Sequence, residues 1–151
     1  MANRRARNIE TKKFKEPLSN HGYRTIAEAV NDMCGTDYES TSMRGVGPLN
    51  ISYMADNKST PTDYIVVFLN GDNGTYGNCL SKKACTDEYD KKYLLERFDH
   101  TKPGHERATF LKQKGTYNFL GIYQYVADFI IDDKKWALWE RTKDWFDDLT
   151  K

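Results

Sequence analysis

The stretch that decides the fold is RATFLKQKGTYNFLGIYQYVADFIIDDKKWALWER, residues 107–141. It contains three successive runs rich in β-branched and aromatic residues, which favour strands. Gly115 and the pair Asp132-Asp133 supply the turns between the runs. The pattern predicts a long aromatic-rich hairpin with strands over 107–112, 117–131 and 135–142.

The middle run of this hairpin is apolar on both of its alternating faces. Tyr and Phe occupy most positions of one face, and the other carries Leu120, Ile122, Val126 and Ile130, so both faces are largely apolar. Such a strand belongs in the middle of a sheet, where both faces are covered. Gly121 interrupts the run and predicts a bend or bulge there. We therefore expect a sheet that is curled or closed into a small open barrel.

The chain upstream of the hairpin alternates between helical and extended patterns. Thr25 and Glu28 form a capping box, and Gly35 suits a left-handed C-cap, so a helix is expected over 25–34. Two apolar runs, 49–54 and 64–69, predict a second hairpin whose later strand is central, because it is apolar on both faces.

Two further helical segments complete the expected secondary structure. Thr86 is a plausible start for a second helix that ends near Arg97. Residues 144–149 are expected to add one or two helical turns with Trp145 and Leu149 packed inward. The sequence as a whole predicts an α+β fold: a curled, mostly antiparallel sheet or small open barrel of about five strands with two or three short helices.

The charge of the chain is concentrated at its N-terminus. The net charge is +1, but residues 1–15 carry six Lys or Arg and one Glu, which leaves −4 for the rest. We expect a flexible basic arm over 1–20 and a single α+β domain over 21–151. Such an arm attracts phosphates without a defined fold. The alternative interpretation is a tail that only aids solubility.

Composition indicates a cytoplasmic protein that does not enter membranes. No window approaches the ~18 uninterrupted apolar residues of a membrane span, and no apolar stretch follows the basic start of the chain. The cysteines, Cys34, Cys79 and Cys85, are odd in number. A disulfide framework is therefore not expected.

Metal and catalytic signatures are weak. Cys79, Cys85, His100 and His105 have zinc-ligand chemistry, but five residues separate the cysteines, whereas zinc fingers use two to four. We favour no metal site, and leave open whether the four side chains converge. The chain contains no Gly-x-Ser-x-Gly elbow and no phosphate-binding Gly-rich loop. No catalytic residue and no cofactor are therefore expected.

The aromatic stripe of the hairpin suggests a nucleic-acid surface. Rings beside Lys and Arg form a platform on which unpaired or flipped bases stack. The alternative is that aromatic side chains at alternating positions of a central strand are part of the hydrophobic core. The candidate nucleic-acid-binding residues are Arg4, Arg5, Arg7, Lys12, Lys13, Arg107, Lys112, Lys114, Tyr117 and Tyr123.

A resemblance supports the same expectation. Arg107-x-Thr-Phe, Tyr117-Asn-Phe-Leu-Gly-Ile-Tyr123 and Lys135-Trp-Ala-Leu-Trp-Glu-Arg141 resemble hairpins of small β-barrel modules found beside bacterial restriction-type nucleases. These modules are broadly similar to the PUA-like barrels that read modified bases. The resemblance covers about a quarter of the chain. It implies a small curled sheet flanked by helices, and binding of nucleic acid, with a modified base as one candidate ligand.

Three functions follow as hypotheses. The first is a nucleic-acid-associated module that uses the basic arm and an aromatic sheet surface. The second is a protein-binding inhibitor or adaptor of phage or mobile-element type, anchored by exposed Trp and Tyr side chains. The third is a fragment of a metal-dependent nuclease.

Overall fold

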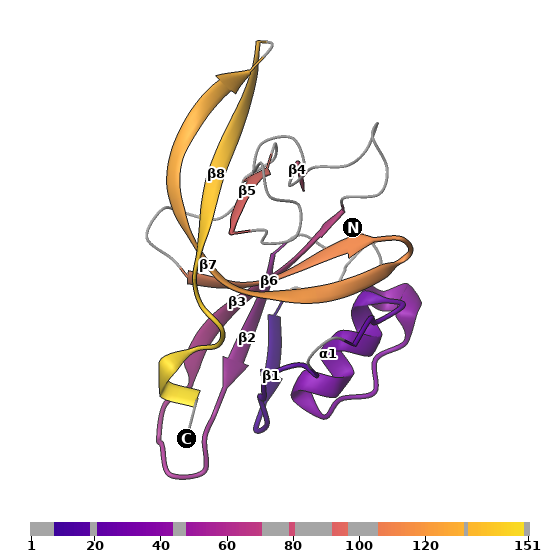
Figure 1. Cartoon of the computed structure of the whole chain (residues 1–151). Coiled ribbons are helices and arrows are strands. Elements are labelled where there is room, and N and C mark those ends of the chain that lie inside the picture. The colour runs from indigo at the N-terminus through magenta and orange to yellow at the C-terminus, as the bar shows by residue number, and fades with distance from the viewer. Residues whose placement is uncertain are drawn as a thin grey trace, which may run out of the picture.

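The computed structural model describes residues 8–18, 21–43, 48–70, 92–96, 106–131 and 133–149, together with the backbone of residues 79–80. This part of the chain contains one sheet, one α-helix and two 3₁₀ helices (Figure 1). The helices are α1 (Ile26–Cys34), η1 (Ser40–Met43) and η2 (Asp147–Leu149). The strands are β1 (Asn8–Thr11), β2 (Leu49–Tyr53), β3 (Thr62–Asn70), β4 (Cys79–Leu80), β5 (Tyr93–Glu96), β6 (Glu106–Gln113), β7 (Thr116–Ile131) and β8 (Lys134–Lys143).

The sheet is mixed and open, with the strand order β1-β2-β3-β6-β7-β8-β5-β4. β1 is parallel to β2, and β3 is parallel to β6, whereas the other neighbours are antiparallel. The expectation of a curled, mostly antiparallel sheet or small open barrel of about five strands with two or three short helices is therefore wrong. The part of the chain that the structure describes has eight strands and a single α-helix.

Short strands toward the two edges account for much of this difference. β1 has the sequence NIET, which contains one apolar residue. So short and polar a segment shows no alternating pattern that would predict a strand. The helix expected from Thr86 to Arg97 is wrong over Tyr93–Glu96, which forms β5 against β8. Lys92 is described and is not helical, whereas residues 86–91 and 97 lie outside those that the structure describes. Four residues are too few to separate a period of 2 from one of 3.6.

The basic arm expected over residues 1–20 enters the fold at Asn8. β1 pairs with β2, and its Ile9 is fully buried. Phe14 is 6% exposed and packs 5.2 Å from Tyr64 and 5.3 Å from Trp145, between ring centroids. These contacts include residues 8–14 in the packed domain, whereas residues 1–7 lie outside the described residues.

The predicted helix is confirmed as α1. The Thr25 side chain accepts a hydrogen bond from the Glu28 amide at 3.0 Å, and the Glu28 carboxylate accepts one from the Arg24 amide at 2.7 Å. These reciprocal bonds satisfy amides that have no partner within the helix. Gly35 ends the helix at a φ of 68°. The buried face of α1, centred on Val30 and Met33, packs on the sheet.

The long hairpin is confirmed, and it bends at Gly121 as predicted. β7 pairs with β6 over residues 116–124 and with β8 over residues 122–131, so its two halves belong to different strand pairs. Figure 1 shows these halves running in different directions. The register between β6 and β7 shifts beside Gly121, whose φ is 133°. A Cβ there would lie 2.8 Å from Cδ of Arg141, which explains the glycine.

The sheet carries a buried cluster on each face. α1, Phe14 and the C-terminal Trp145 and Phe146 cover one face, around Val66. The second cluster includes Val67, Leu69, Leu94, Leu111, Tyr123, Ala137 and Trp139. The predicted β2–β3 hairpin and the central position of β3 are confirmed. The inward packing expected of Trp145 is confirmed too, since it is 5% exposed.

The distal half of β7 departs from the expected two-sided burial. Ile122 and Tyr123 are fully buried, but four apolar residues farther along are exposed: Val126 (46%), Phe129 (46%), Ile130 (69%) and Ile131 (40%). Figure 1 shows this end of the β7–β8 hairpin projecting away from α1 and β1. The expectation that the whole strand is covered on both faces is therefore wrong. Alternation identifies apolar faces but not how far the covering layers extend.

Candidate functional site

The structure separates the predicted nucleic-acid-binding residues into three groups. Lys112, Lys114 and Tyr117 lie together at the turn between β6 and β7. Lys12 and Lys13 are exposed after β1, and the methylene carbons of Lys13 lie near Gly35 at the C-terminal end of α1. Arg4, Arg5 and Arg7 fall outside the described residues. Arg107 and Tyr123 form the third group.

Arg107 and Tyr123 are buried and do not reach the surface as expected. Arg107 is 1% exposed, and its guanidinium forms an ion pair with Glu96, which is 4% exposed. The guanidinium also lies over the ring of Trp139, 3.4 Å from the centroid. Tyr123 is fully buried in the same layer. β6 lies between β3 and β7, and a charged side chain there requires a buried partner.

A backbone contact that is distant in sequence brings Arg24 to the β6–β7 turn. The Tyr23 amide donates to the Tyr117 carbonyl at 2.9 Å, and the Tyr117 amide donates to the Tyr23 carbonyl at 2.8 Å. The Tyr23 hydroxyl donates to the Asp32 carboxylate at 2.5 Å. These bonds place Arg24, the next residue, beside the turn. Strand propensity and motif spacing do not predict a pairing between residues so far apart in the sequence. Arg24 is therefore absent from the residues predicted to bind nucleic acid.

Arg24, Thr25, Ile26, Ser40, Met43, Lys112 and Tyr117 line a hollow of about 200 Å³, which we call the basic hollow. Lys112 and Tyr117 are cross-strand neighbours, and the Lys112 ammonium lies 5.7 Å from the centroid of the Tyr117 ring. Neither Arg24 nor Lys112 forms a salt bridge with another described residue. The amides of Arg24 and Glu28 at the start of α1 already donate hydrogen bonds within the capping box. An anion in the hollow would therefore be attracted mainly by the charges of Arg24 and Lys112.

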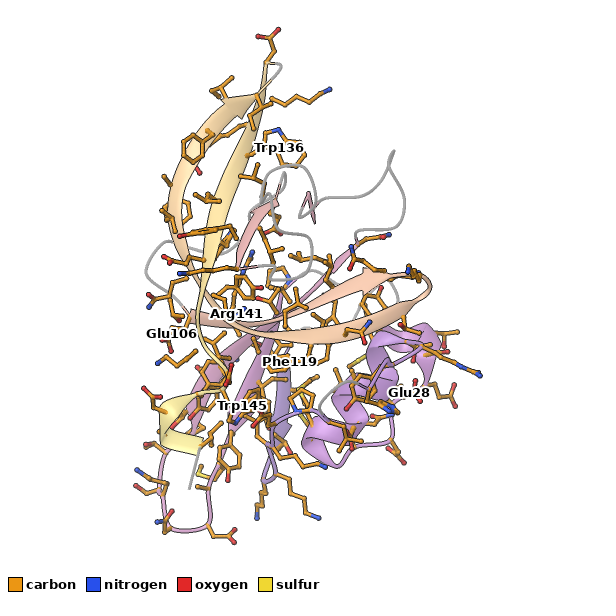
Figure 2. All side chains as sticks on the ribbon, in the orientation of Figure 1. Glu28, Glu106, Phe119, Trp136, Arg141 and Trp145 are labelled. Carbon is orange, nitrogen blue, oxygen red and sulfur yellow. The ribbon has the colours of Figure 1, made fainter. Side chains whose placement is uncertain are left out.

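A second and larger concavity lies between the sheet and the C-terminal segment, and we call it the acidic groove. Its volume is about 760 Å³. Figure 2 labels Glu106, one of its lining residues, and Trp145, whose ring packs against the lining residue Phe146. The lining residues are Asn50, Asp63, Tyr64, Ile65, Glu106, Gln124, Lys143, Phe146, Asp147 and Asp148.

Lys143 neutralises part of the acidic groove. Its ammonium lies 2.8 Å from a Glu106 carboxylate oxygen and 3.0 Å from one of Asp147. These two hydrogen bonds raise the pKa of Lys143. The Tyr64 hydroxyl donates to Asp148 at 2.6 Å, and burial together with that bond raises the pKa of Tyr64. The groove therefore keeps a protonated lysine and a protonated phenol at neutral pH.

The structure provides little for the remaining site hypotheses. Within the described residues, no three His, Cys, Asp or Glu side chains are placed to hold a metal ion. The question about Cys79, Cys85, His100 and His105 falls on side chains outside that part of the chain. Among the same described residues, no helix has the length and apolar character needed to cross a membrane.

Comparison with known proteins found no match to a family model, to a curated protein or to a solved structure.

Proposed function

We propose that the protein is a cytoplasmic module that binds nucleic acid, with a backbone phosphate seated in the basic hollow. The observation that carries the proposal is the meeting of Arg24 and Lys112, two cations without a salt bridge to another described residue, beside the ring of Tyr117. Cations of this kind gain by pairing with phosphate, which also releases counterions from the nucleic acid.

The size of the hollow limits what enters it. About 200 Å³ accommodates a phosphate with part of a sugar or base, and not several stacked nucleotides. Lys114, exposed at the turn, extends the positive surface next to Lys112. The acidic groove is lined by four carboxylates and one lysine, so its own side chains offer no comparable site for a phosphate.

Oligonucleotide titrations followed by fluorescence anisotropy test this proposal. Single- and double-stranded DNA and RNA are titrated at two salt concentrations with the unmodified protein, Arg24→Ala, Lys112→Ala and the control Lys58→Ala. Lys58 is an exposed lysine of the β2–β3 loop. Replacing Arg24 or Lys112 is expected to weaken binding about 3- to 10-fold and to lower the salt slope by about 1. Equal effects of all three variants would reduce binding to net charge, and no binding at low salt would refute the proposal.

The role of the Tyr117 ring is tested separately. The ring lies 5.6 Å from Phe68 in an edge-to-face contact, so it also supports the core. Tyr117→Phe keeps that packing and the ring face and should retain binding, whereas Tyr117→Leu should lose most single-strand affinity, because stacking contributes ~1–3 kcal/mol per base. Circular dichroism of Tyr117→Leu checks that the fold persists. Unchanged binding by that folded variant would remove the ring from the site.

Exposed apolar residues at the distal hairpin favour protein binding as a second candidate function. Phe129, Ile130 and Ile131 form an exposed apolar end, whereas all three tryptophans are buried. A protein partner would therefore dock on these side chains, and not on the tryptophan anchors expected from sequence. Affinity capture should recover one dominant partner with the unmodified protein and with Ser59→Asp, but not with Ile130→Asp. Equal recovery by Ile130→Asp would reject this surface.

A further inference from the structure

The acidic groove has more negative charge than its own lysine balances. Four carboxylates and one ammonium line it, which gives a net charge of −3. Lys143 serves Glu106 and Asp147, but Asp63 and Asp148 have no salt bridge to another described residue. Tyr64, Ile65 and Phe146 add apolar wall. A groove of this composition suits an arginine-bearing peptide, whose side chains combine an apolar stem with a charged end.

The sheet register places Asn8, where the N-terminal segment joins the sheet, two strands away from a residue that lines this groove. Asn8, the first residue of β1, pairs with Asn50 of β2, and Asn50 pairs with Ile65 of β3. Asn50 and Ile65 both line the groove. Neighbouring strands are separated by ~4.8 Å, so the chain enters β1 about 5 Å from one lining residue and about 10 Å from another.

The segment that precedes Asn8 has the complementary charge. Residues 1–7 contain Arg4, Arg5 and Arg7 and no acidic residue. An extended chain spans ~3.3 Å per residue, so Arg4 has a reach of about 13 Å from Asn8 before its side chain is counted. Asp63 pairs with Ser52, and Ser52 pairs with Glu10, so the segment must turn back at Asn8 to meet Asp63. The short tether also keeps the local concentration of the arginines high.

We propose that the acidic groove is the docking site of the chain's own residues 1–7. Arginine guanidiniums of this segment pair with Asp63 and Asp148, and their stems lie against Tyr64 and Phe146. The docking neutralises the net charge of −3 with the three arginines. It holds whether or not the basic hollow binds nucleic acid, and its test uses no nucleic acid.

Zero-length carbodiimide coupling in the full chain tests the docking. Arg5→Lys keeps the positive charge and provides an amine that couples only to a carboxylate in direct contact. Mass spectrometry should find Lys at position 5 joined to Asp63, Asp147 or Asp148, at least about tenfold above its coupling to the exposed Asp56. Coupling of Lys143 to Glu106 or Asp147 is the internal control, because those groups already touch. Coupling spread evenly over surface acids would overturn the proposal.

A charge variant and a labelling experiment complete the test. In Asp63→Asn/Asp147→Asn, coupling of position 5 to Asp148 should fall severalfold, and about 1 M NaCl, where the Debye length is ~3 Å, should abolish it. Asp148 is kept because it holds the Tyr64 hydroxyl. An equal mixture of ¹⁵N-labelled and unlabelled protein should give cross-links within one copy. Cross-links that join labelled to unlabelled peptides would assign the groove to a second copy and refute the proposal.

Discussion

Replacing Glu96 by Gln is expected to destabilise the protein severely, because it leaves the Arg107 guanidinium buried without its anion. The two side chains are 1% and 5% exposed, and the guanidinium is fixed against the ring of Trp139. Removal of one partner from a buried ion pair costs ~3–5 kcal/mol. That is a large share of the ~5–15 kcal/mol by which a domain of this kind is stable. Gln has nearly the same shape as Glu, so the loss of stability measures the effect of removing the charge and not a change in packing.

Arg107→Met should be destabilising for the converse reason, since a carboxylate then remains buried. The double variant Arg107→Met/Glu96→Gln leaves no buried charge and is expected to be about 2 kcal/mol more stable than either single variant. Urea denaturation of the four proteins measures this difference. Asp128→Asn is the matched control, because Asp128 pairs with Lys135 where the side chains are 39% and 70% exposed. It should cost less than about 1 kcal/mol.

Additive effects of the two core substitutions would refute this reasoning. If the double variant loses the sum of the single losses within about 0.5 kcal/mol, the two groups do not interact. A cost of Glu96→Gln no larger than that of Asp128→Asn would show that both groups are hydrated.

Three further perturbations test local features of the fold. Gly121→Ala should cost about 1–3 kcal/mol more than Gly115→Ala by urea denaturation, because a Cβ at Gly121 would meet Arg141 and the Lys143 carbonyl, whereas the space at Gly115 is open. Thr25→Ala should cost about 1 kcal/mol and Thr25→Ser much less, since Ser also caps the Glu28 amide. Burial raises the pKa of Cys34 from 9.0 to about 12, so the thiol ionises first in the unfolded chain, and the free energy of unfolding should fall as pH rises from 9 toward 12. Cys34→Ala should show a shallower fall across that range. An identical fall would show that the Cys34 thiol does not cause it.

Local signals in the sequence predicted the elements whose determinants are close together. The capping box and Gly35 defined α1, and the alternation around Gly121 defined the hairpin and its bend. The strand count was wrong because β1 exists through its pairing with β2, and because four residues of β5 are compatible with either period. Edge strands depend on their neighbours, and those neighbours are distant in sequence.

The basic hollow was predictable only in part. Lys112, Lys114 and Tyr117 are close together in the sequence, around the predicted turn at Gly115. Their spacing alone therefore predicts that they lie near one another. Arg24 joins them through the Tyr23–Tyr117 backbone bonds, which no local pattern reveals. Arg107 is buried, in contrast to the predicted surface position, because it pairs with Glu96 of β5. The sequence pattern predicts a helix over Glu96, so it gives no sign of this buried partner.

The arrangement of charge connects the two proposals. If residues 1–7 dock in the acidic groove, their arginines are neutralised, and Arg24 and Lys112 are the described cations that line the basic hollow. A nucleic acid that recruits the arginines must displace them from Asp63 and Asp148, so its gain is reduced by the ion pairs that it breaks. Variants that remove those carboxylates would then bind nucleic acid more tightly without any change in the basic hollow. On these two proposals, the carboxylates of the groove would set how much of the N-terminal charge a nucleic acid can use.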